Sequence, residues 1–517
     1  MPRLPGQAWN VRSPEAPISD RVAISFDPPA GSLRSSAARG AVATGAGQAV
    51  KMGCQLVSVL VLSRLLTPDD FGLVIMCAPV ITFLGMFQSL GLVQATVQRP
   101  SIDHARVNFL FWINVAASVA ISALLVLSAP LVADFYNEPR VGPLIAAMAI
   151  PMLLTGASSQ HSALLTRRMR FGQLASLDAF SAATTLIGSI ACALVQPSYW
   201  ALFGGTLIGA GLTTAATWIA SGWRPSLPRS VPDGWEMLNF GAGITGFSFA
   251  NFFARNLDNI LIGRYWGGVQ LGLYDRAYKL LLFPLTQIAN PLSRVMVPAL
   301  SRMASEPDRY RAAYIQVIRL TLLATLPGVA WGTAMAGSLI PLALGPQWAG
   351  SAPIFAALGF AGLVQPLNNP AGWLFISQGR SRDYMIWGIW TAGFATAAFG
   401  IGIFYGAIGV AMAYSASEYL KTPLLWHYVG RKGPVRSSHI VREAGPLLLG
   451  AHVAIAVVWL LRDEFVGAPV VALAQGLLLS YAVSIAFVAI FRSGRGSIKD
   501  ATNLVWRSIR SLRMATV

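Results

Sequence analysis

Between Gly40 and Phe491 the chain consists of long apolar stretches separated by short polar segments. Each stretch has about the 20 residues that an α-helix, rising about 1.5 Å per residue, needs to cross a bilayer core. The pattern predicts an all-α polytopic membrane protein with about 14 transmembrane helices. The expected spans are 41–62, 71–94, 109–129, 141–165, 174–195, 199–220, 237–262, 280–300, 314–336, 352–376, 384–404, 407–426, 444–461 and 467–491.

Composition and charge placement support a membrane protein. Hydrophobic residues make up 55% of the chain and charged residues 11%, against about 25% charged residues in soluble domains. If the N-terminus is cytoplasmic, 27 of the 38 Lys and Arg residues fall on the cytoplasmic side. This bias predicts that both termini are inside. It also attributes the net charge of +17 to topology and to anionic membrane lipids, so no nucleic-acid partner is expected.

The sequence contains traces of an internal duplication. Arg64 is followed by seven residues and then Gly72-Leu73, and Arg264 is followed by seven residues and then Gly272-Leu273. A second similarity pairs 143–148 with 353–358. The offsets of about 200 and 210 residues indicate that six spans were duplicated. Because six is an even number, the two halves should have the same orientation in the membrane.

The duplication predicts the organisation of the chain. Residues 41–222 and 236–430 should form two six-helix lobes related by a pseudo-two-fold axis, with two further helices at 444–491. Residues 1–40, rich in proline, are expected to be a disordered cytoplasmic tail, and 492–517 a basic cytoplasmic tail. Two facing lobes are typical of alternating-access transporters that bind their substrate at the repeat interface.

The connections on the outer side should be short. The longest are expected near 263–278 and 338–351, which leaves no room for a folded outer domain. In the basic tail, Val505, Ile509 and Leu512 have helical spacing, which predicts a short amphipathic helix on the inner membrane surface.

Several polar residues inside the spans share helix faces. Charged groups in a bilayer cost about 2.5–3.5 kcal/mol on insertion scales, so each needs a reason. The spacings of three and four residues place them in stripes on the first, seventh and eighth spans. We therefore expect a hydrated cationic cavity between the lobes. Its predicted lining residues are Gln48, Lys51, Gln55, Gln94, Asn251, Arg255, Asp258, Asn290 and Arg294.

Structural explanations for these residues are also open. Polar stripes can hold membrane helices together, and Arg255 with Asp258 could form an ion pair. Arg294 could extend its guanidinium to the membrane surface. Glu418 and Lys421, three residues apart, are expected to pair with each other. The His and Cys residues have no metal-ligand spacing, so neither a metal site nor a cofactor is expected; a coupling ion, H⁺ or Na⁺, is left open.

A cationic cavity favours an anionic cargo. Lys and Arg are common partners of phosphate groups, and Arg can bind them with two parallel hydrogen bonds. The Asn and Gln side chains of the stripes can bond sugar hydroxyls. This chemistry suits a lipid that carries a phosphorylated sugar head group.

Five segments resemble a known family: Leu62–Leu73, Ser89–Ala95, Asn256–Arg264, Leu271–Tyr278 and Val297–Arg302. They are similar to bacterial polysaccharide exporters, the Wzx-type oligosaccharide flippases of the multidrug/oligosaccharidyl-lipid/polysaccharide superfamily, in particular its colanic-acid-like exopolysaccharide branch. The resemblance covers about residues 40–490. It implies a two-lobed fold of fourteen helices and no enzymatic activity.

The resemblance also implies a cargo. Polyprenyl-pyrophosphate-linked oligosaccharide would be flipped across the bacterial cytoplasmic (inner) membrane for exopolysaccharide or lipopolysaccharide (O-antigen) synthesis, with glycosyltransferases and a polysaccharide polymerase as possible partners. A multidrug or other lipid-head-group exporter of the same superfamily is the first alternative, although the first span carries Lys51 and no carboxylate. A membrane-embedded polysaccharide polymerase or ligase is the second; it generally needs a sizeable outer loop with clustered His, Arg or carboxylates, which is not expected here.

Overall fold

The computed structural model describes residues 33–88, 96–97, 102–228, 231 and 234–515. Of these, the side chains of 33–43, 234–255, 504–505 and 507–515 lie outside the description. The described chain is almost entirely helical, as the apolar stretches predict. Eleven helical segments are long and apolar enough to cross a membrane.

The helices follow the predicted spans closely. They are α1 (Leu33–Leu65), α2 (Pro68–Gln88), α4 (His104–Tyr136), α5 (Val141–Arg167), α6 (Phe171–Val195), α7 (Tyr199–Ser221), α8 (Gly234–Arg302), α9 (Pro307–Ala334), α10 (Ala336–Leu344), α11 (Ser351–Asn368), α12 (Ala371–Ser377), α13 (Ser381–Gly402), α14 (Gly406–Gly430), α15 (Ser437–Leu461), α16 (Pro469–Ile490) and α17 (Arg492–Ala515). Short 3₁₀ turns cover Pro346–Trp348 (η1), Ile403–Tyr405 (η2) and Arg462–Glu464 (η3).

Two of the eleven segments each contain two crossings. Asn256–Arg302 has 47 residues and Ser381–Gly430 has 50, which at about 1.5 Å per residue is twice the thickness of a bilayer core. The first bends at Gly267, whose φ of 76° and ψ of −176° are not helical. The second turns through η2 to Gly406, also with φ of 76°. Glycine tolerates this backbone conformation because it has no Cβ.

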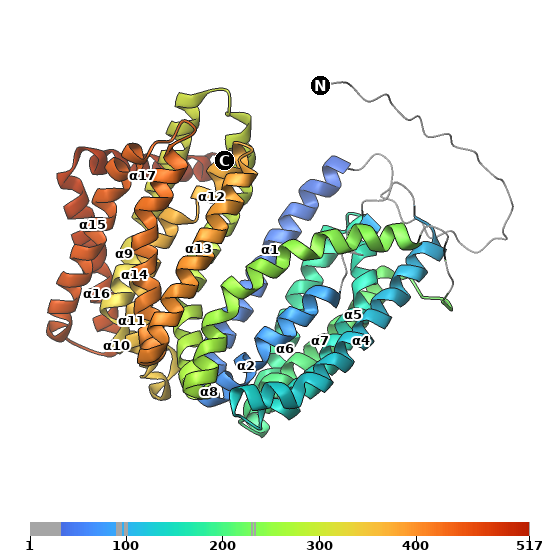
Figure 1. Ribbon diagram of the computed structural model, residues 1–517. Coiled ribbons are helices and arrows are strands. Elements are labelled where there is room, and N and C mark those ends of the chain that lie inside the picture. The colour runs from blue at the N-terminus through green and yellow to red at the C-terminus, as the bar shows by residue number, and fades with distance from the viewer. Residues whose placement is uncertain (1–32, 89–95, 98–101, 229–230, 232–233, 516–517) are drawn as a thin grey trace.

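The helices form two lobes, as predicted (Figure 1). In the N-lobe α1 packs against α6, α4 against α5, and α7 against both α5 and α6. In the C-lobe α11 packs against α8, α9 and α14, and α13 packs against α14. The last two membrane helices, α15 and α16, pack on α9 at the side of the C-lobe.

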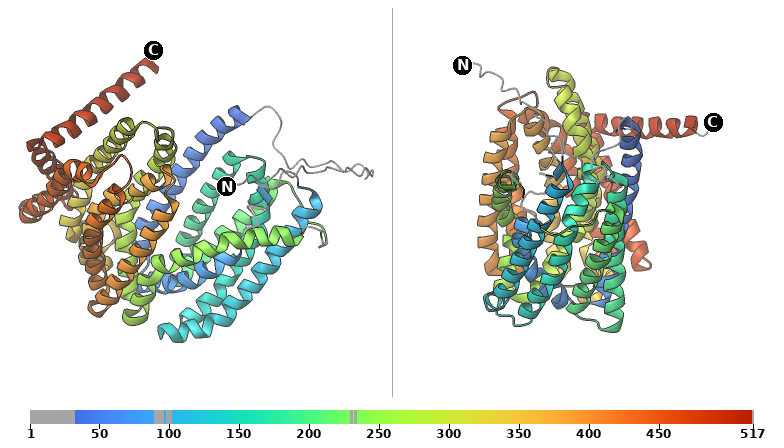
Figure 2. Two further views of the ribbon diagram at one scale, coloured as in Figure 1. Left: turned by 45° about the horizontal axis from the view of Figure 1, so that its top comes forward. Right: turned by 90° about the vertical axis from the view of Figure 1, so that its right-hand side faces the viewer.

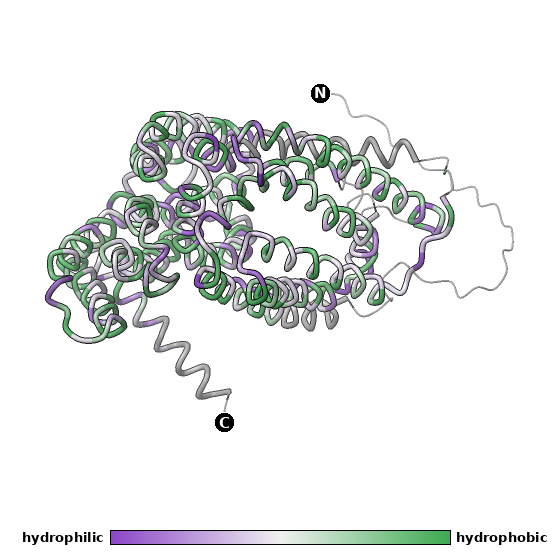
Figure 3. The backbone as a smooth tube through the Cα atoms, turned by 90° about the horizontal axis from the view of Figure 1, so that it is seen from below, coloured by the Kyte–Doolittle hydropathy of each residue, from purple (hydrophilic) through white to green (hydrophobic). Residues whose placement is uncertain are grey.

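The two lobes meet at one end and diverge toward the other (Figures 1 and 2). We call the first the joined end; it carries the turn 66–67, the turn 137–140, Gly267 and η1. We call the opposite end, where α1 begins and α17 lies, the terminal end. Apolar residues dominate the bundle in the hydropathy view (Figure 3).

Three boundaries differ from the sequence expectations. The helix α1 begins at Leu33, inside the stretch expected to be a disordered tail. The expected outer loop 263–278 is helical except at Gly267. Its charged residues therefore lie in the helical turns next to the bend. The basic tail forms α17, whose first half is tied to the C-lobe where Nη1 of Arg319 lies 3.4 Å from a carboxylate oxygen of Asp500.

Candidate functional site

Glycines allow α2 and α8 to touch at the joined end. A Cβ on Gly72 would overlap the carbonyl oxygen of Gly268, and a Cβ on Gly272 would overlap the carbonyl oxygen of Pro68. The two contacts correspond to each other under the repeat offset of 200, which relates 72 to 272 and 68 to 268. The two lobes therefore meet at a pseudo-symmetric helix crossing in which each copy of the repeat contacts the other.

A second pair of contacts continues this symmetry. Trp348 donates a hydrogen bond from Nε1 to the carbonyl oxygen of Ser63 at 2.5 Å, and Gln347 donates to the same oxygen at 2.8 Å. In the other half of the repeat, a Cβ on Gly263 would lie 2.8 Å from the ring of Tyr136. The end of the first span thus contacts the turn between α10 and α11, and the end of the seventh span contacts the turn between α4 and α5.

Three arginines also cross between the lobes at this end. Arg64 donates from Nη2 to the carbonyl oxygen of Leu342 at 2.7 Å. Arg264 donates from Nη1 to the side-chain oxygen of Asn137 at 2.9 Å, in the amide orientation that also satisfies the Asn137 nitrogen. The guanidinium of Arg276 lies 3.7 Å from the ring centroid of Phe71.

The turn between α4 and α5 carries the carboxylates of this region. Arg140 bonds Glu138 and Asp69, each at 2.8 Å, and connects the turn to the start of α2. The hydrogen bond from Arg140 holds the pKa of the Glu138 carboxyl below its usual range. The same contact raises the pKa of Arg140.

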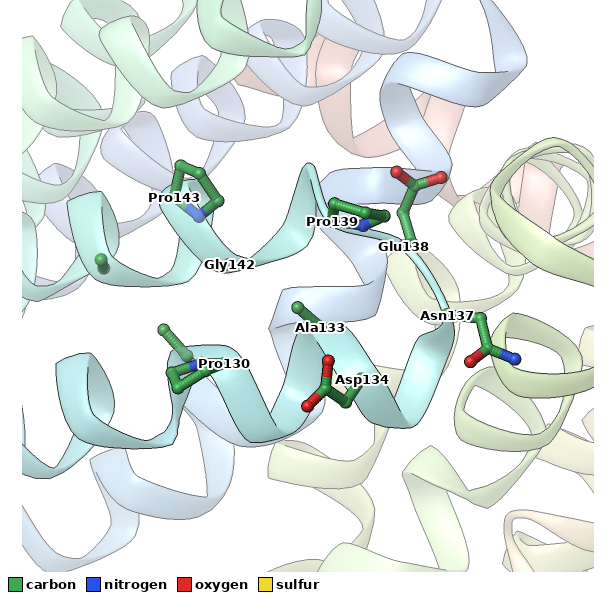
Figure 4. Close-up of a pocket in the computed structure, with 10 residues that line it drawn as sticks. Pro130, Ala133, Asp134, Asn137, Glu138, Pro139, Gly142 and Pro143 are labelled. Atoms are coloured by element: carbon green, nitrogen blue, oxygen red, sulfur yellow. The ribbon is translucent and has the colours of Figure 1, made fainter.

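A pocket of about 670 Å³ opens beside this turn (Figure 4). It is lined by the end of α4 and the start of α5, and Asp134 and Glu138 are its charged residues. Negative lining does not suit a pyrophosphate, and none of the predicted cavity residues contributes to it.

The stripe predicted on the first span lies on α1, which faces the C-lobe along the edge of the N-lobe (Figure 1). Gln48 and Gln55 are exposed, and Lys51 is partly buried. On α8, Asn290 and Arg294 are exposed. These five residues therefore lie on accessible surfaces of the two lobes; that they line one cavity remains a prediction.

The described cations inside the spans fall into two groups. Arg319 pairs with Glu443, and Lys421 pairs with Glu418, as expected for the latter pair. Within the described part of the chain, Lys51 and Arg294 have neither an ion pair nor a hydrogen bond to a side chain. Of the stripe cations whose side chains are described, these two remain available to an external anion.

The remaining predicted residues have other outcomes. Asp258 is 7% exposed and accepts hydrogen bonds from the backbone of Asn259 at 2.9 Å and from Tyr274 at 3.1 Å. It therefore lies inside the packing of α8 rather than on an open surface. The side chains of Asn251 and Arg255, and the whole of Gln94, lie outside the described residues.

Two buried polar networks were not predicted from the sequence. In the N-lobe, Gln160 donates to Thr96 at 2.9 Å and lies 3.4 Å from the amide nitrogen of Asn114. In the C-lobe, Tyr414 lies beneath the ammonium of Lys421 at 5.9 Å and accepts a hydrogen bond from Gln365 at 3.3 Å. Uncharged polar residues scattered through apolar spans give no signal for such contacts, which depend on which helices become neighbours. Among the described residues, no group of three His, Cys, Asp or Glu residues is placed to hold a metal.

Comparisons with characterised proteins support a role in polysaccharide assembly. The chain is 23% identical over 415 residues to the lipopolysaccharide biosynthesis protein WzxC of Escherichia coli (strain K12), covering 79% of this chain and 83% of that protein. It is 24% identical over 363 residues to the succinoglycan biosynthesis transport protein ExoT of Rhizobium meliloti (strain 1021), covering 70% and 73% of the two chains.

Solved structures show the same fold. The lipid II flippase MurJ in an inward closed conformation aligns with a TM-score of 0.69 at 13% identity, over 87% of this chain and 98% of MurJ. An inward-facing multidrug resistance MATE family transporter of the MOP superfamily aligns with a TM-score of 0.54 at 12% identity, over 79% and 95%. Because both identities are low, these matches show the architecture and not the cargo.

The family relationship rests on a match to a family model. Residues 61–353, more than half of the chain, match the family model described as "Polysaccharide biosynthesis protein". This range includes the joined end and most of both lobes. The chain therefore belongs to this family of polysaccharide biosynthesis proteins.

Proposed function

We propose that the protein flips polyprenyl-pyrophosphate-linked oligosaccharide across the bacterial cytoplasmic membrane by alternating access. The observation that carries the proposal is the contrast between paired and unpaired cations in the spans. Arg319 and Lys421 have carboxylate partners, whereas Lys51 and Arg294 have none among the residues that the structure describes. Since an unpaired charge is costly in a membrane protein, the proposal gives Lys51 and Arg294 a ligand, the pyrophosphate.

The basic residues provide the orientation in this proposal. The terminal end, with the cationic α17, faces the cytoplasm by the positive-inside rule, and the joined end faces outward. Lobes that are in contact on the outer side and apart on the inner side suit a state that loads cargo from the inner leaflet. Outward release then requires the joined end to separate.

The other groups have supporting roles in this mechanism. Gln48, Gln55 and Asn290 offer amides to sugar hydroxyls, while Lys51 and Arg294 attract the diphosphate. A coupling ion, H⁺ or Na⁺, would provide the driving force, and glycosyltransferases and a polymerase would act before and after transport.

The test is substitution of the unpaired cations. Lys51→Gln and Arg294→Gln should each reduce polymer output and should cause lipid-linked repeat units to accumulate in the inner leaflet. Arg302→Gln is the matched control, since Arg302 is an exposed residue at the end of the same helix as Arg294. Wild-type output from well-expressed Lys51→Gln and Arg294→Gln proteins would contradict the proposal.

Export of organic cations is the competing function, because the fold is shared with a multidrug transporter. It would require an acceptor for positive charge in the binding region. Cells that produce the protein should then gain drug resistance, and this resistance should be unaffected or improved by Lys51→Gln. We expect no such resistance.

A further inference from the structure

The three arginines that cross between the lobes at the joined end are all held by uncharged groups. Arg64 bonds a backbone carbonyl, Arg264 bonds an amide, and Arg276 lies on an aromatic ring. Among the described residues, no carboxylate comes within salt-bridge distance of any of the three. This set is distinct from Lys51 and Arg294.

The chemistry of these contacts differs from that of the neighbouring Arg140. Arg140 bonds two carboxylates, Glu138 and Asp69, so its charge is balanced whether the lobes are together or apart. Arg64, Arg264 and Arg276 instead lose their partners when the lobes separate, because every one of those partners belongs to the opposite lobe. Separation would therefore free three guanidinium groups, whereas Asp69 and Glu138 keep Arg140, and Asp275 keeps Lys279.

The three residues occupy related places at the joined end. Arg64 and Arg264 are equivalent in the duplicated halves and lie at the ends of the first and seventh spans. Arg276 is four residues beyond Gly272, which is about one helical turn deeper into the membrane. It is 7% exposed, so in the present state it is closed off from an anion.

We propose that Arg64, Arg264 and Arg276 form a second anion site that exists only when the joined end opens. The site receives the pyrophosphate of the cargo after the lobes separate. The anion then replaces the carbonyl, amide and ring contacts, so bound cargo stabilises the open joined end. This inference rests on the proposed function, but it uses different residues and a different conformation.

The test compares the closed and the opened protein. Gly72→Val should hold the joined end open, since its side chain overlaps the carbonyl of Gly268. Gly337→Val is the matched control, because a Cβ at Gly337 has no atom within 4 Å. Full-length proteins in nanodiscs are titrated with geranylgeranyl pyrophosphate, and native mass spectrometry counts the bound molecules.

The Gly72→Val protein should bind one more molecule of geranylgeranyl pyrophosphate than the wild-type protein or the Gly337→Val protein binds. Adding Arg64→Gln, Arg264→Gln and Arg276→Gln to Gly72→Val should remove that additional molecule. Adding Arg64→Lys, Arg264→Lys and Arg276→Lys to Gly72→Val should retain part of it. Equal stoichiometry in Gly72→Val with and without the three arginines would overturn the proposal.

The two proposals can fail separately. If Lys51→Gln and Arg294→Gln leave cargo export unchanged but the arginine-dependent binding persists, the proposed inner site is wrong and the outer site stands. If the Gly72→Val protein does not fold, the arginine substitutions are tested by cargo export in a protein that retains Gly72. Arg64→Gln with Arg264→Gln and Arg276→Gln should lower export at least tenfold, with partial recovery by lysine, and wild-type export would overturn the outer site.

Discussion

Gly272 lies against the start of α2, where a Cβ added to it would stand 3.2 Å from the backbone nitrogen of Gly72. The two glycines hold the same place in the duplicated halves. Each leaves room for a carbonyl of the opposite lobe, and together they define a pseudo-symmetric contact. The segments Leu62–Leu73 and Leu271–Tyr278, which carry the family resemblance, therefore form the surface on which the lobes meet.

Substitution of Gly272 should weaken this contact. We expect Gly272→Ala to destabilise the joined end by about 1–3 kcal/mol, because its methyl group overlaps the Pro68 carbonyl and the crowded helices must separate. The readout is labelling of a cysteine introduced at Ser63, which is buried at the joined end. Gly337→Ala is the control. Equal labelling in the two variants would contradict the prediction that the contact between Gly272 and Pro68 holds the lobes together.

Trp348 should contribute to the same contact in two ways. Its Nε1 bonds the Ser63 carbonyl, and its ring lies 5.5 Å from the ring of Phe71. Trp348→Phe removes the hydrogen bond but retains an aromatic ring, with an expected cost of about 0.5–1.5 kcal/mol. Trp348→Ala also removes the buried ring and should cost about 3–5 kcal/mol. Thermal unfolding in detergent would measure both, and equal midpoints would contradict this order.

The sequence predicts the membrane helices well but not the contacts between them. The apolar stretches are a local signal, so the ends of α5, α6 and α7 agree with the expected spans within a few residues. Arg276 shows the limit of such reasoning. It falls in the expected outer loop 263–278, but the structure places it in α8, where it lies on Phe71 of the opposite lobe and is buried. The repeat could have indicated this, because residue 276 corresponds to 76, within the second span.

The candidate site was predictable only in part. Helical spacing finds the stripes of α1 and α8, since residues three and four apart share a face. It cannot distinguish an accessible residue from a buried one on the same helix, as Asp258 demonstrates. Nor can it tell a paired cation from a free one when the partner is distant in sequence, as Arg319 and Glu443 are.

The turn between α4 and α5 should make stability depend on pH. The pKa of Glu138 is lowered by Arg140 in the folded protein, so the folded state favours the ionised carboxylate. The resulting stabilisation is present above the unfolded pKa of about 4.3 and is lost as the pH falls through the lower folded pKa. Thermal unfolding of the wild-type protein between pH 7 and pH 3 should show this loss.

Arg140→Gln is the matched variant for the pH experiment. Without the guanidinium, Glu138 should titrate near its ordinary value, and the variant should lose less stability on acidification than the wild-type protein. A wild-type and a variant curve that run parallel from pH 7 to pH 3 would show that this ion pair does not contribute.

The buried pair of Glu418 and Lys421 allows a structural role to be separated from a role in transport. The two side chains are 2.6 Å apart and almost fully buried in α14. Lys421→Met leaves a buried carboxylate unpaired and should cost about 3–5 kcal/mol, whereas Glu418→Gln with Lys421→Met should be close to neutral. Unfolding measurements of the two single variants and the double variant give the coupling energy. If the pair only stabilises the C-lobe, the double variant should regain both wild-type stability and polymer export; a stable double variant that fails to export would instead assign the pair a part in the transport cycle.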